Sequence, residues 1–529
     1  MHQVISADGS SVTANRLQRG VLLLILSIPS LYVFLLVPPL WRDSDGFNEI
    51  AGTFAPMGII HWLPAYCLGG RLIVFGGSIA ASLMAGHGIP NLSISNTPLS
   101  DAGIYTLILV QHLFLIFSLF YAVTALSDHF KLRASFAVLF ALTPWLYIYA
   151  NCVGTEAFSN PLVYLIAACG WNCLRAPQLN KREIIIYFGL LLTAALTRQI
   201  NAVLPALLPI ALLPLAGKEL LLHAAAAHPA KNRAQYRYTQ RFLIFLVVGL
   251  SAIGSSLLVQ KSLCWLFRVP FRSTFGETFE WRLSYLQGLS KQDRDTIVAG
   301  IIAKANDPII TEALDALSRS LDQGEKWADM FLINKINEIL LRAGTFKEMQ
   351  LLTWQRDLKL NRIAMCVLFS GEPHFISAVW ADFGRSLFIT QTELASPPFI
   401  LTDFLHTELP DPKLDRLRGI ASFQHPEGYY EAVWNRVPYF HLFDRIPMLV
   451  MGGLTITFSG LALLGAARDP LTLAGVSHAA GMIVTGLLIS GGTCLSAGYA
   501  ARFHMPVFSL LQMSMLLAVS VAARVLSPK

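Results

Sequence analysis

The sequence has few charged residues: they make up 14% of its 529 residues, against roughly 25% in a typical soluble domain. It is instead 54% hydrophobic, with a mean hydropathy of +0.53. A soluble fold of this size could not bury that much apolar surface. The composition therefore excludes a soluble enzyme and a disordered chain, and it makes the lipid bilayer the expected solvent.

The seven cysteines form no metal-binding or disulfide pattern. They occur mostly within apolar runs, with no CxxC pair and no Cys/His cluster at zinc spacing. Cys169 and Cys173 stand four residues apart on an expected helix, where packing explains them better than a bridge. The sequence thus lacks the framework of a disulfide scaffold and implies no zinc centre.

Long apolar segments dominate what remains. A membrane-spanning helix needs ~20 predominantly apolar residues, and about ten segments approach this requirement. They are residues 20–40, 104–126, 134–150, 157–173, 184–197, 200–215, 242–259, 446–466, 471–497 and 507–523. The predicted fold is an α-helical polytopic membrane protein with about 10 transmembrane helices.

Positive charges set the expected orientation, because Lys and Arg concentrate in cytoplasmic loops. With the N-terminus inside, 15 Lys and Arg residues fall on the inner side. The short outer segments carry only Arg42, Arg71, Arg198 and Arg502. Both termini are therefore expected in the cytoplasm. The net charge of +7 is then a topology signal, and no nucleic-acid partner is needed to explain it.

One long stretch is polar. Residues 263–445 contain 23 of the 33 acidic residues, so we expect a water-facing, extracytoplasmic and mostly helical domain there. Asp307-Pro308 suits a helix start, and residues 325–341 carry an apolar stripe at helical spacing. The expected domains are residues 1–262, a transmembrane module with a catalytic first outer loop (41–103), then 263–445, and the terminal helices 446–529. Within that loop, residues 50–83 are expected to form interfacial helices.

Acids are scarce elsewhere, which makes two outer turns conspicuous. Asp43, Asp45 and Glu49 follow the first span directly, and Glu156 lies in the turn between the third and fourth spans. Ionisable residues near the membrane are costly and commonly functional. Closely spaced carboxylates raise a pKa and can create a general base. An Asp-x-Asp pair can instead hold a divalent cation, the one cofactor these residues suggest. The third interpretation is an interfacial acidic turn that caps the next helix.

Cationic side chains on the same side complement these carboxylates. Arg198 ends the fifth span, and Arg502 and His504 open the last one. A guanidinium bonds a phosphate bidentately, so these residues are candidates for substrate binding, together with Arg42 and Glu49. Snorkelling of Arg to the lipid headgroups is the alternative.

In this arrangement the chain resembles the polytopic glycosyltransferases of the GT-C group, which take sugars from polyprenyl-phosphate carriers. The resemblance covers the layout of nearly the whole chain: an inward N-terminus, an acidic motif opening the first outer loop, interfacial helices, a second outer acid and a large outer domain. It implies that Asp43 or Asp45 is the catalytic base or a metal ligand, and that Glu156 is the second acid. Arg198, Arg502 and His504 would hold the carrier phosphate. The sequence departs from the family's usual Asp-Glu pair with an Asp-Ser-Asp, so sugar and acceptor stay open.

The resemblance implies an expected function. The chain is expected to be an integral-membrane glycosyltransferase that moves a sugar from a polyprenyl-phosphate carrier to an extracytoplasmic glycan, lipid or protein by a single inverting displacement. No Walker motif for nucleotide is present. The alternatives are a lipid-sugar flippase or transporter, a surface-polysaccharide polymerase or ligase, and a non-catalytic assembly protein. The lack of a cysteine framework and of a retention signal favours a bacterial inner membrane over the endoplasmic reticulum.

Overall fold

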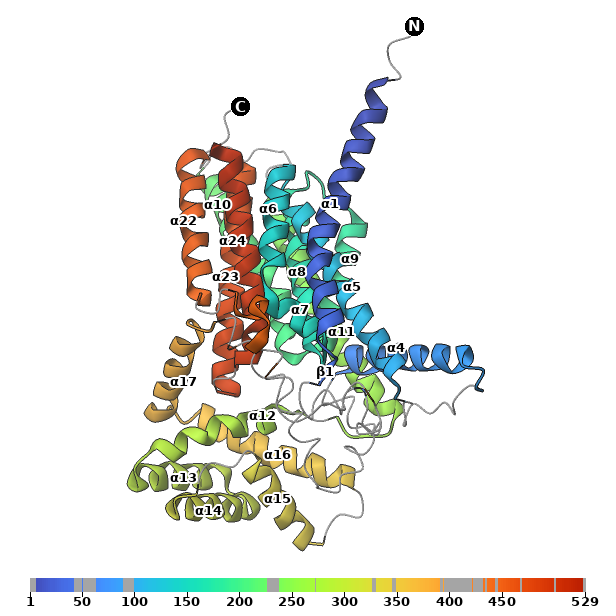
Figure 1. Ribbon diagram of the computed structural model, residues 1–529. Helices are drawn as coiled ribbons and strands as arrows, with labels where there is room; N and C mark the ends of the chain where they lie inside the picture. Colours follow the sequence, from blue (N-terminus) through green and yellow to red (C-terminus); the bar gives the residue numbers. More distant parts are fainter. Residues whose placement is uncertain are drawn as a thin grey trace. The chain divides into compact units, whose positions relative to one another are not determined.

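A computed structural model shows a chain that is almost entirely helical (Figure 1). The structure describes residues 6–41, 50, 63–88, 99–225, 237–271, 273–325, 330–344, 349–390, 393, 421, 432, 435–442, 446–466, 469–498 and 501–526. The described chain forms two compact units. Unit 1 comprises Met1–Leu257, Ile389–Leu487 and Met505–Lys529, and unit 2 comprises Leu258–Phe388 and Leu488–His504.

Unit 1 is a helical bundle, and its elements follow the apolar segments of the sequence closely. Its first half comprises α1 (Ser6–Leu36), β1 (Leu40–Trp41), α4 (Pro64–Met84), α5 (Asp101–Leu126), α6 (Phe130–Ala141), α7 (Pro144–Ala150), β2 (Cys152–Val153), α8 (Glu156–Arg175) and α9 (Lys181–Thr197). Its second half comprises η1 (Gln199–Ala206), α10 (Leu207–Ala225), most of α11 (Arg237–Leu266), η6 (Pro438–His441), α22 (Met448–Ala466), most of α23 (Pro470–Ser496) and α24 (Met505–Leu526).

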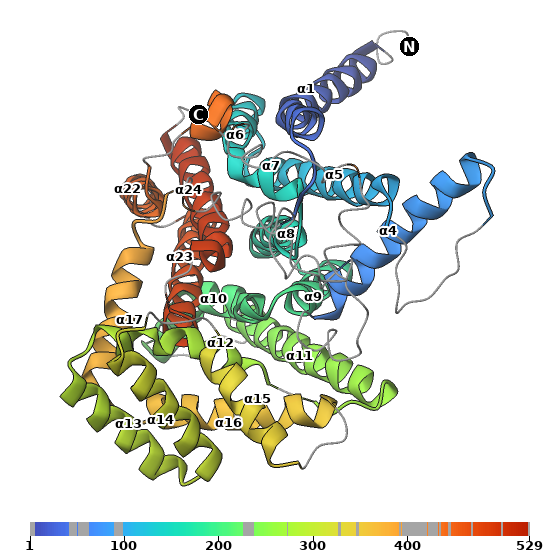
Figure 2. The same ribbon diagram turned by 60° about the horizontal axis from the view of Figure 1, so that its bottom comes forward.

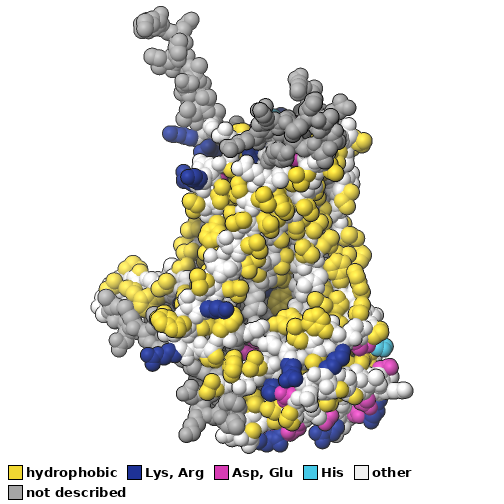
Figure 3. Space-filling model, turned by 180° about the vertical axis from the view of Figure 1, so that it is seen from behind, with side chains coloured by type: hydrophobic (Ala, Val, Ile, Leu, Met, Phe, Trp, Pro, Cys, Tyr) yellow, Lys and Arg dark blue, Asp and Glu magenta, His cyan; other side chains and the backbone are white. Residues whose placement is uncertain are grey.

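Eight described helices are long and apolar enough to cross a membrane, and the number rises to 10 if each of two bent helix pairs counts as one span. The described chain is therefore a polytopic helical membrane protein. Side chains on the outside of the bundle agree with a lipid solvent: Leu24, Leu35, Ile185, Val247 and Leu464 are between 62% and 88% exposed. On the face shown in Figure 3, hydrophobic side chains cover the helices of unit 1 and charged side chains gather over unit 2.

The expected third span is bent. α6 and α7 meet at 64° across Leu142 and Thr143, because Pro144 has no amide hydrogen to continue the helix. Every residue of α7 is buried. The kink turns the chain inward before it reaches β2, which places the following turn inside the bundle.

α8 is the central helix of unit 1. Nearly all of its side chains are buried, and it packs against α5, α7, α9 and α24. A central helix needs no lipid-facing side, which explains why α8 holds polar residues such as Asn160 and Asn172 among its apolar ones.

α4 meets the length and composition of a membrane span, yet its direction differs from that of the other helices of unit 1. Figures 1 and 2 both show α4 running across the axes of α1, α5 and α8. It contacts α5 so closely that a Cβ at Gly103 would lie 2.5 Å from the carbonyl oxygen of Val74. The interfacial placement expected for residues 50–83 stays a prediction, and residues 51–62 lie outside the described part.

Unit 2 holds most of the polar stretch and is helical as expected. It comprises α12 (Phe275–Arg282), η3 (Leu283–Gly288), α13 (Lys291–Ala305), α14 (Pro308–Asp322), α15 (Phe331–Arg342), α16 (Met349–Leu368), α17 (Pro373–Ser386) and η7 (Ala501–His504), with the last turns of α11 and α23. Its core joins the apolar stripes of α13 to α16. The predicted helix start at Asp307 is confirmed, since its carboxylate accepts from the amides of Ile309 and Ile310.

The boundaries of unit 2 differ from the expected water-facing domain. The described residues after Ile389 group with unit 1, and Leu488–His504 group with unit 2. The division into 1–262, 263–445 and 446–529 therefore stays a prediction.

Candidate functional site

The turn that carries Glu156 is joined to the end of α1. β1 and β2 form a short parallel pair in which Leu40 lies opposite Cys152 and Trp41 opposite Val153. The acidic run of the first outer loop begins at Asp43, two residues after β1 in the sequence. Arg42, Asp43, Asp45 and Glu49 themselves lie outside the described residues. The structure thus places the end of β1, at Trp41, beside the strand that leads into the Glu156 turn.

Asn151 holds this junction together. Its side-chain amide donates to the carbonyl oxygens of Val37 and Pro38, both at 2.9 Å, and its backbone oxygen accepts from the amide of Leu40 at 3.0 Å. Its Oδ1 lies 3.3 Å from Nε2 of His112. These bonds satisfy backbone groups that the end of α1 leaves open, so they fix the exit of the chain from the first span.

A second polar network fixes the same turn to α4 and α5. The hydroxyl of Tyr66 donates to Gln111 at 3.0 Å and accepts from the amide of Gly154 at 2.8 Å. The Gln111 amide donates to the backbone oxygens of Ala150 and Cys152, each at 2.9 Å. Tyr66 and Gln111 are both fully buried. Such a network is costly unless it is fully satisfied, so it specifies one conformation of the turn.

Glu156 forms a buried ion pair with Arg198. Arg198 Nη2 lies 3.2 Å from Glu156 Oε1, and the two residues are only 9% and 5% exposed. Glu156 is the first residue of α8, and Arg198 follows the last residue of α9. Each charge therefore faces the helix end that favours it electrostatically. The sequence placed both residues in the site, but it did not predict that they contact each other.

Polar contacts hold neighbouring elements around this pair. Ser159 and Asn201 are hydrogen-bonded at 3.1 Å, and Asn201 also donates to the backbone oxygen of Ala194 at 3.0 Å. Asn160 donates to Sδ of Met505 at 3.6 Å. α8, η1 and the first residue of α24 are therefore joined one turn away from Glu156.

Arg502 and His504 belong to unit 2, so their position relative to Glu156 is not determined. The side chain of Arg502 lies outside the described part. His504 is fully buried, with its Nε2 3.9 Å from Sγ of Cys494. Burial against a thiol gives His504 a packing environment within unit 2, and its role in substrate binding stays a prediction.

Several residues of the site escaped the sequence analysis: Tyr66, Gln111, Asn151 and Asn201. All four are polar side chains in or next to apolar segments, where an unsatisfied polar group is expensive. That cost is the sequence signal which could have found them. The hydrogen-bond partners of these residues could not have been found from the sequence. Gln111 bonds a residue 39 positions away, and Asn151 bonds one 114 positions away.

The described residues contain no group of three or more His, Cys, Asp or Glu side chains that could hold a metal ion. The proposed cation ligands Asp43 and Asp45 are outside that search. Whether a divalent cation takes part therefore depends on those two residues and stays a prediction.

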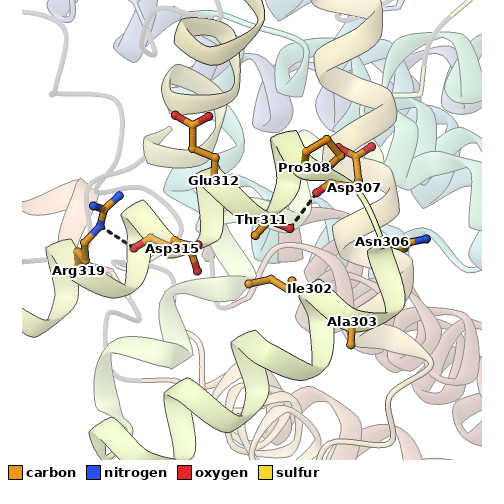
Figure 4. A pocket seen from close by; sticks show the side chains of 9 residues that line it. All are labelled: Ile302, Ala303, Asn306, Asp307, Pro308, Thr311, Glu312, Asp315 and Arg319. Carbon is orange, nitrogen blue, oxygen red and sulfur yellow. Dashed lines mark hydrogen bonds between the residues drawn. The ribbon is translucent and has the colours of Figure 1, made fainter.

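A cavity of about 620 Å³ lies in unit 2, and none of the candidate site residues of the sequence analysis lines it. Figure 4 shows its lining from α13 and α14, including Asp307, Glu312 and Asp315. Two of the acids that line the cavity stabilise unit 2. Asp307 caps α14 and pairs with Lys359, and Glu312 pairs with Arg342. These contacts account for the charges of Asp307 and Glu312 without a ligand.

No protein-family model and no curated protein matches the sequence. Among solved structures, the chain is similar to the archaeal oligosaccharyltransferase AglB from Archaeoglobus fulgidus in complex with an inhibitory peptide and a dolichol-phosphate. The identity is 11% and the TM-score 0.39, with 96% of this chain and 50% of that chain covered. The chain thus spans about half the length of that protein. A likeness at this level transfers no activity, so the proposals below depend on this chain's own residues.

Proposed function

We propose that the protein is an integral-membrane glycosyltransferase that takes a sugar from a polyprenyl-phosphate carrier and transfers it to an acceptor outside the cytoplasm. The observation that supports this most directly is the Glu156–Arg198 pair in a turn that is tied, through β2 and β1, to the start of the acidic run. An acid and a guanidinium thus meet beside the strand pair, and the carboxylate-rich loop follows β1 in the sequence.

The chemistry proposed is one inverting displacement. Asp43 or Asp45 removes the proton from an acceptor hydroxyl, whose oxygen attacks the anomeric carbon of the carrier-linked sugar. The bond between that carbon and the phosphate oxygen breaks, and the electron pair leaves with the polyprenyl phosphate. Arg198 stabilises the negative charge that develops on this leaving group. No covalent enzyme intermediate is formed.

Glu156 acts on Arg198 in this proposal. A carboxylate 3.2 Å from the guanidinium fixes its orientation, and a planar guanidinium matches the geometry of phosphate oxygens. Arg42, Glu49, Arg502 and His504 are the further candidates for holding substrate. The donor reaches the site from the bilayer, as its polyprenyl tail requires.

Position favours transfer over transport. Flippases and transporters bind substrate near the bilayer midplane with broken helices. Glu156 and Arg198 instead lie at the ends of α8 and α9, which is where a reaction at the membrane surface needs them.

The test replaces the carboxylates one at a time. Asp43→Asn or Asp45→Asn should abolish sugar transfer in membranes supplied with the organism's lipid-linked sugars, while the protein still folds. Asp128→Asn is the matched control, because Asp128 is exposed and pairs with Arg133 at the opposite end of α5. Full transfer by both correctly folded loop variants would overturn the proposal. Mass spectrometry of lipid-linked sugars and surface glycans after gene deletion identifies the sugar and acceptor.

A further inference from the structure

α17 in unit 2 presents an apolar face that no described part of the chain covers. Ile376 and Trp380 lie four residues apart, hence on one side of the helix, and are 44% and 66% exposed. Phe388, just after the helix, is 59% exposed. On another side, Phe375 is buried, with its ring 5.9 Å from that of Phe279 in the unit 2 core. α17 is therefore apolar both toward the core and toward its surroundings, unlike a helix that faces water.

α17 is bonded to the end of a membrane span. Oγ of Ser386 lies 3.1 Å from Oγ of Ser490, a buried residue of α23. α23 ends at Ser496, six residues or about 9 Å beyond Ser490 at the α-helical rise. The C-terminal end of α17 thus lies within two turns of the point where this span ends.

A second contact confirms this placement within unit 2. Asp382 of α17 forms an ion pair with Arg282 of α12. A Cβ at Gly498, two residues after α23, would lie 3.4 Å from Nη1 of Arg282 and 3.7 Å from Oδ2 of Asp382. Both polar anchors of α17, Asp382 and Ser386, therefore lie beside the last turns of α23.

The exposed side chains beside these anchors are apolar. Leu488 and Leu495, in the same turns of α23, are 50% and 40% exposed. Trp265, in the last turn of the span α11, is 82% exposed. Tryptophan is enriched where a membrane span meets water, because its ring is apolar and its N–H is polar. Trp380 is a second exposed tryptophan, on α17, which forms with α16 one of the two bent helix pairs, at 94°.

We propose that α17 is an interfacial helix, whose Ile376–Trp380 face inserts between the lipid headgroups and acyl chains and anchors unit 2 to the bilayer. The bilayer is the occupant because α17 is hydrogen-bonded to the last turns of the apolar span α23, whose residues Leu488 and Leu495 are exposed there. The inference is independent of the proposed transfer reaction, since it depends only on the exposed face and on its distance from the end of a span.

The test measures the depth of spin labels in the full-length protein reconstituted in phosphatidylcholine–phosphatidylglycerol nanodiscs. Nitroxides are attached at Trp380→Cys and, to keep the apolar face intact, at the neighbouring exposed position Ala381→Cys. The background carries Cys366→Ser, because Cys366 is the described cysteine that is not buried. Trp265→Cys supplies the interface reference, and Lys304→Cys, exposed on α13, supplies the water reference.

Labels at positions 380 and 381 should collide several-fold more with oxygen than with a water-soluble nickel chelate, relative to the label at position 304, and should match position 265. A ratio equal to that at position 304 would show a water-facing helix and overturn the proposal. Low collision rates with both reagents would show that protein covers the face, which overturns it equally.

Discussion

At the residue scale, the ion pair between Glu156 and Arg198 gives the candidate site its charge balance. Both residues are almost fully buried, and each lies at a helix end whose dipole favours it. A buried pair contributes little net stability, since desolvation offsets the attraction. The presence of this pair in a membrane bundle is therefore better explained by the orientation that Glu156 gives to the Arg198 guanidinium.

Removing one partner of the pair should reveal the desolvation cost of the other, because its charge stays buried without compensation. Glu156→Gln and Arg198→Gln should each lower the free energy of unfolding by about 3 kcal/mol, because each leaves an uncompensated buried charge. The double variant should recover part of this loss. Denaturant unfolding of the purified protein in mixed micelles measures all three. Simple additivity of the two losses would show that the residues are not coupled.

Sugar transfer by the same double variant separates two roles of the pair. If Arg198 stabilises the leaving phosphate, transfer should stay lost although stability recovers. If the pair only packs α8 against α9, transfer should return together with stability.

At the element scale, helix positions follow from apolar periodicity, whereas helix contacts depend on single residues. Gly276 of α12 is such a residue. A Cβ there would lie 2.3 Å from the backbone nitrogen of Asn361 and 2.4 Å from the carbonyl carbon of Leu360 in α16. These are backbone atoms, which cannot move aside as a flexible side chain does.

We therefore expect Gly276→Ala to destabilise unit 2 by about 1–3 kcal/mol through overpacking. Gly300→Ala is the matched control, because a Cβ at this helical glycine of α13 meets nothing within 4 Å. That change should stabilise by up to about 1 kcal/mol through helix propensity. Limited proteolysis of the full-length protein measures how fast unit 2 is cleaved in each variant. Equal cleavage rates for Gly276→Ala and Gly300→Ala would contradict the predicted overpacking.

Glu280 shows how one element caps another across the sequence. Its carboxylate accepts from the amides of Leu332 and Ile333, at 2.7 and 3.2 Å, in the first turn of α15. α15 has no side-chain cap of its own, because Met330 stands at its N-cap position. Burial raises the pKa of Glu280 from 4.5 to about 7, although the two amides oppose this shift.

This pKa predicts a pH dependence. Between pH 4.5 and about 7, the folded chain holds a proton that the unfolded chain has released, so folding stability falls as the pH rises through this window. Hydrogen exchange at the amides of Leu332 and Ile333, corrected for its intrinsic pH dependence, should show decreasing protection. Glu280→Gln should remove the slope, since Gln does not titrate. An unchanged slope in this variant would assign the effect to another group.

At the scale of the whole molecule, the orientation in the membrane stays a prediction from charge placement. It states that Lys181, the first residue of α9, faces the cytoplasm and that Lys304, on α13, faces the other side. Lys181→Cys should react with an impermeant maleimide only after the membrane is permeabilised, and Lys304→Cys should react in intact cells. Both side chains are exposed, which makes the pair a matched comparison. The opposite labelling pattern would invert the topology and move the candidate site to the cytoplasmic side.

The sequence by itself determined the solvent and the elements. Ten apolar segments, scarce charge and the cap at Asp307-Pro308 are local properties. The helices α5, α8, α9, α11 and α22 to α24 lie at the segments expected for them, α1 ends four residues earlier than expected, and residues 200–215 are divided between η1 and α10. The predicted span at residues 134–150 became the bent pair α6 and α7, because a proline at position 144 interrupts the backbone bonding.

Only the tertiary structure decided which residues meet. The contact of Glu156 with Arg198, the pairing of β1 with β2 and the bond from Asn151 to Val37, just after α1, join residues 42 to 114 positions apart. Apolar periodicity states which side of a helix is buried, but not which helix it is buried against. The partners are chosen when the bundle closes and each buried polar group must find one.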